Sequence, residues 1–140
     1  MNTLVLIRLL LDGGLVVLIW MIQIVVYPSF LYYESENLVK WHKEYTSRFS
    51  FIVMPLMLGQ LGIGSYHFFL ENNFYNLTSL VIISLLWIVT FSHFVPIHTK
   101  LSKGMVNEQL LLSLIKKNWI RTLLWTLLFV YSFYHTISLD

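Results

Sequence analysis

Four long apolar segments dominate this sequence of 140 residues. Crossing about 30 Å of hydrocarbon takes roughly 20 apolar residues in a helix, at about 1.5 Å per residue. The segments cover residues 3–30, 48–70, 76–98 and 117–138. Each is expected to be helical, because backbone groups inside a bilayer must hydrogen-bond within the protein. We predict an all-α membrane protein, a single domain over residues 1–140 with four transmembrane helices in an antiparallel bundle.

Composition excludes several other classes of protein. Apolar residues make up 57% of the chain and charged residues 11%, with a mean hydropathy of +0.71. Soluble domains average about 45–50% apolar and about 25% charged residues, and disordered chains are more polar still. The chain has no cysteine, which excludes a disulfide framework, thiolate metal sites, iron–sulfur clusters and thiol nucleophiles.

The connections between the apolar segments differ in length. The link at residues 71–75 is tight, which makes its two helices antiparallel neighbours. The link at residues 31–47 is longer, and we expect a short interfacial helix from Glu34 to Tyr45, with Leu38 and Trp41 on one side. The last helix is expected to begin near Asn107 and to project beyond the bilayer.

The basic residues predict the orientation in the membrane. The two longer links and their flanks hold eight of the nine lysines and arginines, and Arg8 alone lies on the other side. Cytoplasmic loops carry an excess of such residues. For a bacterial inner membrane, which we take as the location, the pattern predicts both loops in the cytoplasm and both termini on the outer side. Because these residues flank membrane ends, no nucleic-acid partner is expected.

Polar side chains on all four predicted helices lie at one depth, near the cytoplasmic side. Such residues are costly in a bilayer and face protein or water, so they mark candidate sites. Asn118, Arg121 and Trp125 share one helix face. The candidate catalytic residues are His98, Arg121, Asn118 and His42, and the candidate ligand-binding residues are Gln23, Tyr27, Tyr45, Arg48, His93 and Trp125.

A second polar group lies toward the outer side. Arg8 and Asp12 are spaced to pair along one helix, and Gln60 lies nearer the middle of the second. His67 and His135 lie near the same end. Most such histidines are interfacial, but the pair could ligate a b-type haem between the second and fourth helices.

A metal ion is the other cofactor that we consider, with His42, His93 and His98 as candidate ligands. His93 and His98 are five residues apart, about 140° around a helix, so they do not share a face. No glutamate lies within a span, which excludes a di-iron carboxylate site. The cofactor therefore stays unknown, with a metal ion or haem as alternatives.

Several motifs resemble those of small, uncharacterised bacterial four-helix membrane proteins, and more distantly the DUF1772, or anthrone-oxygenase-like, family. The motifs are Gln23-x-x-x-Tyr27-Pro28-x-Phe30, Trp41-His42-x-x-Tyr45-x-x-Arg48, Pro55-x-Met57-x-x-Gln60, Val95-Pro96-x-His98-x-x-Leu101-x-x-Gly104 and Asn118-Trp119-x-Arg121-Thr122-x-x-Trp125. The resemblance implies a four-helix fold, with a proline motif closing the third helix and an Asn/Trp/Arg motif opening the fourth. That family commonly has Pro-x-Asn where this chain has Pro96-Ile97-His98.

These observations lead to three functional hypotheses. The first is a cytoplasmic-side pocket for a lipophilic ligand or metal-type cofactor, with redox or oxygenase-like chemistry. There His98 or His42 acts as ligand or general base, and Arg121 and Asn118 stabilise an oxyanion. The second is a non-catalytic accessory subunit, in a homo-oligomer or larger membrane complex, whose polar layer bonds helices together. The third is a haem protein using His67 and His135.

Overall fold

The computed structural model describes residues 3–139, and all regular structure in that range is helical. This confirms the predicted all-α class. The first long segment comprises α1 (Thr3–Met21), η1 (Ile22–Val26), α2 (Tyr27–Ser29) and η2 (Phe30–Tyr32). The second is α3 (Ser35–Leu70). The third joins α4 (Phe74–Val89), η3 (Thr90–Phe94) and α5 (Val95–Ser102), and the fourth is α6 (Glu108–Leu139).

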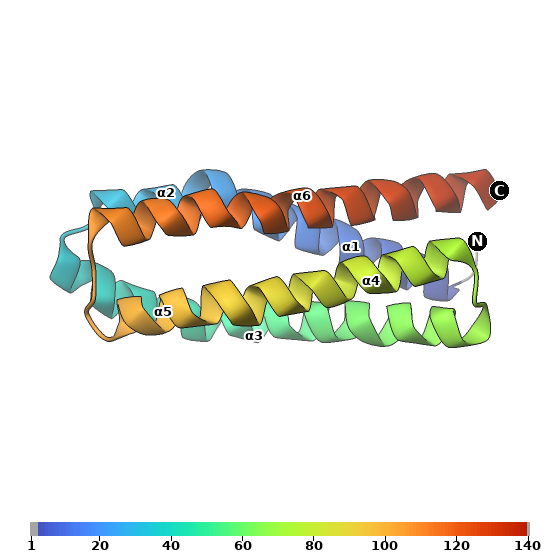
Figure 1. The fold of residues 1–140 in the computed structure, drawn as a ribbon, viewed down its shortest axis with the longest axis horizontal. Helices are drawn as coiled ribbons and strands as arrows, with labels where there is room; N and C mark the ends of the chain where they lie inside the picture. Colours follow the sequence, from blue (N-terminus) through green and yellow to red (C-terminus); the bar gives the residue numbers. More distant parts are fainter. Residues whose placement is uncertain (1–2, 140) are drawn as a thin grey trace.

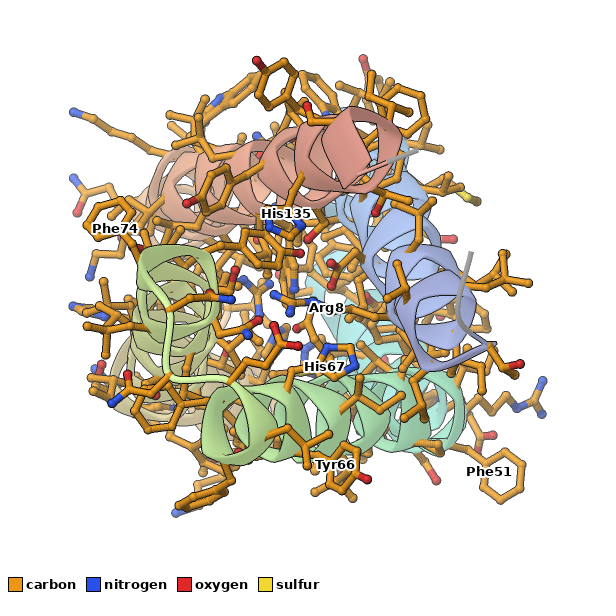
Figure 2. The ribbon with its side chains drawn as sticks, turned by 90° about the vertical axis from the view of Figure 1, so that its right-hand side faces the viewer. Arg8, Phe51, Tyr66, His67, Phe74 and His135 are labelled. Atoms are coloured by element: carbon orange, nitrogen blue, oxygen red, sulfur yellow. The ribbon has the colours of Figure 1, made fainter. Side chains whose placement is uncertain are left out.

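The long segments lie side by side along the long axis of the molecule (Figure 1). Helix α1 packs against α3 and α6, and α4 packs against the same two helices. Seen along the axis, the helices surround a common interior (Figure 2). The α3–α4 connection lies at one end of this helical bundle, and the connections that precede α3 and α6 lie at the other (Figure 1).

Of two helix boundaries predicted from the sequence, one is wrong and the other is confirmed. The short interfacial helix expected between the first two segments is not separate, because Ser35–Leu70 is one continuous helix. The last helix starts at Glu108, as predicted, where the Asn107 side chain accepts a hydrogen bond from the Leu110 amide at 2.7 Å. Gly104 ends the preceding turn with a φ of 85°, a conformation that favours glycine.

The exterior of the described chain is rich in apolar side chains. Three helical segments are long and apolar enough to cross a membrane: Thr3–Tyr32, Ser35–Leu70 and Phe74–Ser102. Helix α6 is not among them, although Leu123, Leu127 and Val130 give it an exposed apolar face. An outward apolar surface over a polar interior is consistent with a membrane protein.

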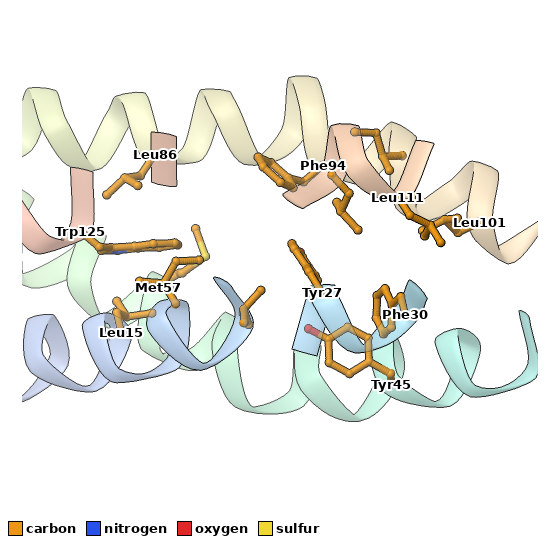
Figure 3. Packing of buried hydrophobic residues seen from close by; sticks show 14 of the residues in the cluster. Leu15, Tyr27, Phe30, Tyr45, Met57, Leu86, Phe94, Leu101, Leu111 and Trp125 are labelled. Carbon is orange, nitrogen blue, oxygen red and sulfur yellow. The ribbon is translucent and has the colours of Figure 1, made fainter. Parts of the chain in front are cut away.

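A cluster of buried side chains holds the helices together between the polar layers. Leu15, Leu86 and Leu128 are almost fully buried, and Met57 and Trp125 pack into the same region (Figure 3). In a bilayer, helix association depends on such close packing, because lipid tails are as apolar as leucine.

Two π-helical turns were not predicted from the sequence. Ile22–Val26 ends two residues before Pro28, and Thr90–Phe94 ends two residues before Pro96. Proline cannot donate a backbone hydrogen bond, and its ring crowds the carbonyl four residues earlier. A widened turn accommodates that ring, and such turns occur frequently at functional sites.

The packing can be tested at two neighbouring leucines of α4. Leu86 is fully buried, whereas Leu85 is exposed. Leu86→Ala should lower the free energy of unfolding in detergent by about 2 kcal/mol or more, because it leaves a cavity. Leu85→Ala is the matched control and should change it by less than about 0.5 kcal/mol. Equal effects in a denaturant titration would contradict the packing described.

Candidate functional site

A buried hydrogen-bond network surrounds Arg121 on α6. The guanidinium Nε and Nη2 donate to the Asn118 side-chain oxygen at 2.9 and 2.7 Å, and Nη2 also donates to the Tyr27 hydroxyl at 3.0 Å. The Asn118 amide donates to Gln23 Oε1 at 2.9 Å, and Gln23 Nε2 donates to the Ile115 carbonyl at 3.2 Å. These contacts fix Arg121 in one orientation and join α6 to the first helical segment.

A chain of hydrogen bonds leads from Tyr27 to the end of α5. The Tyr27 hydroxyl lies 3.0 Å from His98 Nε2, and His98 Nδ1 lies 2.7 Å from His42 Nε2. His42 Nδ1 in turn lies 3.1 Å from the hydroxyl of Ser102. The two imidazole rings are stacked, with centroids 4.9 Å apart and an interplanar angle of 23°. We call Tyr27, His98, His42 and Ser102 the relay.

The hydrogen bonds of the relay can all point in one direction. Arginine can only donate, so the Tyr27 oxygen accepts from Arg121. The Tyr27 hydrogen can bond to His98 Nε2. In that tautomer the His98 hydrogen is on Nδ1, facing His42, and His42 donates from its own Nδ1 to Ser102. The relay can move a proton because each member is within hydrogen-bonding distance of the next.

Arg121 is 7% exposed. Among the described residues, none of the ion pairs within 4.0 Å includes it; they join Arg8 to Asp12, Lys40 to Glu36 and Arg48 to Glu44. The guanidinium carbon lies 3.6 Å from the centroid of the Phe94 ring, a cation–π contact. A buried charge without an opposite charge is costly, so this site favours an electron-rich ligand.

A cavity of about 160 Å³ lies beside the network. Its polar walls include Tyr27, His98 and Arg121. Most of the remaining lining is apolar or aromatic, and Figure 3 shows Leu15, Tyr45, Met57, Phe94 and Trp125 among these side chains. An apolar cavity with a few convergent polar groups is the usual form of a small-molecule site.

Most of the predicted site residues are brought together. His42, His98, Asn118, Arg121, Gln23 and Tyr27 belong to one connected network, whereas Tyr45 and Trp125 line the cavity. Asn118 differs from its expected role, because it does not line the cavity and its oxygen accepts from Arg121. In the structure Asn118 positions Arg121, and a catalytic role for it stays a prediction.

Two predicted ligand-binding residues lie outside the network. The Arg48 side chain is 75% exposed and pairs with Glu44 at 3.3 Å. His93 is exposed, with its Nδ1 3.0 Å from the hydroxyl of neighbouring Ser92. The structure thus excludes His93 from any shared ligand set with His42 and His98. Over the described residues, no group of three or more His, Asp or Glu side chains could hold a metal ion.

The two histidines of the haem hypothesis line one cavity at the opposite end of the bundle. Arg8 lies between His67 and His135 in Figure 2, and its Nη1 is 3.4 Å from His67 Nδ1. The His135 ring stacks on Tyr75, with centroids 3.6 Å apart. The His67 and His135 rings therefore already have partners, Arg8 and Tyr75, and haem ligation by this pair stays a prediction.

Sequence reasoning missed several polar partners. Ser102 ends the relay, and Thr122 donates to Gln23 Oε1 at 3.1 Å. Gln60 links two layers, since it accepts from Trp125 at 3.2 Å and donates to Asp12 at 2.6 Å. The spacing of Asn118 and Thr122 at i and i+4 was the one available signal, because it places both on one face.

Comparison with protein-family models, with curated proteins and with solved structures gives no match. The resemblance to the anthrone-oxygenase-like family therefore stays a prediction from the motifs.

The structural part of the network can be tested at Asn118. Asn118→Ala leaves the Arg121 guanidinium without its two shortest hydrogen bonds, so the free energy of unfolding in detergent should fall by about 1–3 kcal/mol. Asn72→Ala, in the exposed α3–α4 connection, is the control and should have little effect. An Asn118 variant as stable as the control would contradict the network.

Proposed function

We propose that the chain is an integral membrane protein with four spanning helices in an antiparallel bundle, with the two longer loops facing the bacterial cytoplasm and both termini on the outer side. The three long apolar segments, the apolar outer face of α6 and the buried polar interior support this. The distribution of basic residues supports the orientation.

The absence of cysteine allows a clean test of this topology. Single substitutions Asn72→Cys and Lys103→Cys place a thiol in the α3–α4 and α5–α6 connections. In intact cells, a membrane-impermeant maleimide should label Cys at position 72, and should label position 103 only after lysis. The reverse pattern would contradict the orientation, and equal labelling at both positions in intact cells would contradict membrane insertion.

We propose that the cavity beside Arg121 binds a lipophilic ligand with a carbonyl or phenolic oxygen. The observation that carries this proposal is the buried Arg121 guanidinium, which lines an otherwise apolar cavity and has no carboxylate partner among the described residues. A ligand oxygen would accept hydrogen bonds there while its apolar part contacts the aromatic walls.

The relay would supply acid–base chemistry to that ligand. Tyr27 and His98 line the cavity, whereas His42 does not and would act through His98. His98 is the candidate general base, and Arg121 would stabilise negative charge that develops on the ligand oxygen. The proton would pass from His98 Nδ1 to His42 and then toward Ser102, which is partly exposed.

An accessory, non-catalytic role is the second candidate. It is favoured by contacts such as Gln23 with Asn118 and Ile115, which connect two helical segments. Such bonds average about 0.6 kcal/mol in a membrane protein, enough to contribute to helix association. In this case Arg121 would bind no ligand, and the same experiment distinguishes the two functions.

The test uses anthrone, an aromatic ketone chosen from the motif resemblance, in a binding titration of the protein in lipid nanodiscs. The wild type should bind saturably. Arg121→Gln and His98→Gln should weaken binding by about tenfold or more, which corresponds to about 1.4 kcal/mol. Arg48→Gln and His93→Gln make the same chemical changes at exposed positions and should retain wild-type affinity.

Equal binding of anthrone by all four variants would contradict binding in the cavity beside Arg121. If the wild type shows no saturable binding, the accessory role is favoured. Denaturation curves for each variant separate a lost ligand contact from lost folding.

A further inference from the structure

A second cavity, of about 280 Å³, lies at the end of the bundle opposite the relay. Its lining includes Arg8 from α1, His67 from α3, Tyr75 and Asn76 from α4, and His135 from α6. Figure 2 views this end, with Arg8 between the two histidines. Neither the relay nor the Arg121 site shares a residue with this lining.

Arg8 is almost fully buried, at 3% exposure, yet only some of its hydrogen-bond donors have a partner. Its Nη1 donates to Asn76 Oδ1 at 3.2 Å and lies 3.4 Å from His67 Nδ1. Within the part of the chain that the structure describes, Nε and Nη2 have no hydrogen-bond partner. An unsatisfied buried donor is costly, and two on one charged group mark a site for an acceptor.

The two free donors define the shape of that acceptor. Nε and Nη2 form one planar edge of a guanidinium, and this edge matches the two oxygens of a carboxylate in a bidentate pair. The face of the guanidinium is already covered, because its carbon lies 4.6 Å from the centroid of the Tyr75 ring.

The groups around Arg8 offer one further donor, and the acidic side chains near it are either already hydrogen-bonded or exposed. Arg8 can only donate, so His67 Nδ1 accepts and the His67 hydrogen is on Nε2. Asp12 is 4.0 Å from Arg8 Nε, beyond hydrogen-bonding distance. It does not line the cavity, and its oxygens accept from Gln60 at 2.6 Å and Ser132 at 2.7 Å. Glu71 is the acidic residue of the lining, and it is exposed.

The remaining wall includes Val5, Leu9 and Leu70, which suit a short alkyl chain. We propose that this cavity binds the carboxylate of a small aliphatic acid, with Arg8 as the bidentate anchor and His67 as an additional donor. The acid can be a soluble short-chain acid or a membrane fatty acid, and the chemistry of its head group is the same.

The first arm of the test needs no variant. The wild-type protein in nanodiscs is titrated with ¹³C-carboxyl butyrate at constant sodium chloride, and the carboxyl resonance is followed by NMR. Saturable binding of butyrate, with at least tenfold weaker binding of butyramide and inorganic phosphate, supports a carboxylate site. Equal binding of phosphate overturns the carboxylate assignment, and a response to butyrate that does not saturate overturns the proposal.

The second arm tests whether Arg8 binds the carboxylate, and whether the natural acid comes from solution or from the bilayer. Arg8→Gln should weaken butyrate binding by about tenfold or more, and Arg8→Lys should weaken it as well, because an ammonium keeps the charge but loses the planar edge. Arg48→Gln is the control for charge and should bind as the wild type does. Unchanged binding by a folded Arg8 variant overturns the proposal. Oleate in the bilayer competes with butyrate if the natural ligand is a fatty acid, and does not compete if the site takes soluble acids.

Discussion

Arg121 imposes the constraint on which the half of the bundle that holds the relay depends. A guanidinium buried among apolar helices must have its hydrogen bonds supplied by the protein, because a buried charged group without partners is costly. Asn118 and Tyr27 supply them, Gln23 holds Asn118, and Tyr27 is in turn bonded to His98. One buried charge therefore accounts for the position of side chains on three of the long helical segments.

Each end of the bundle buries an arginine, but the groups around the two guanidiniums differ. At the Arg121 end, neutral groups surround the charge and a small cavity borders it. At the other end, Arg8 has Asp12 nearby, but two of its donors have no hydrogen-bond partner among residues 3–139, and it lines a larger cavity. Gln60 lies between the two arrangements, bonded to both Trp125 and Asp12. Each buried arginine thus leads to a separate binding proposal.

Much of the fold and of the site could be predicted from the sequence, because polar residues are rare in it. Apolar length located the long helices, and helical periodicity placed Asn118, Arg121 and Trp125 on one buried face, as observed. The spacing of His93 and His98 correctly separated their faces, but it could not say which one points inward. That choice depends on the rotation of the whole helix, and the π-turn at Thr90–Phe94 changes this rotation locally. Partners such as Ser102 depend on contacts between segments, which periodicity within one helix does not report.

The most direct test of the relay is a measurement on the histidines themselves. The chain has five, so ¹⁵N-histidine NMR in nanodiscs gives a tractable spectrum. We expect a scalar coupling across the His98 Nδ1 to His42 Nε2 hydrogen bond, and shifts of both residues when anthrone is added. The exposed His93 should show neither effect. Absence of the coupling, or shifts of His98 and His42 no larger than that of His93, would contradict a relay linked to the Arg121 cavity.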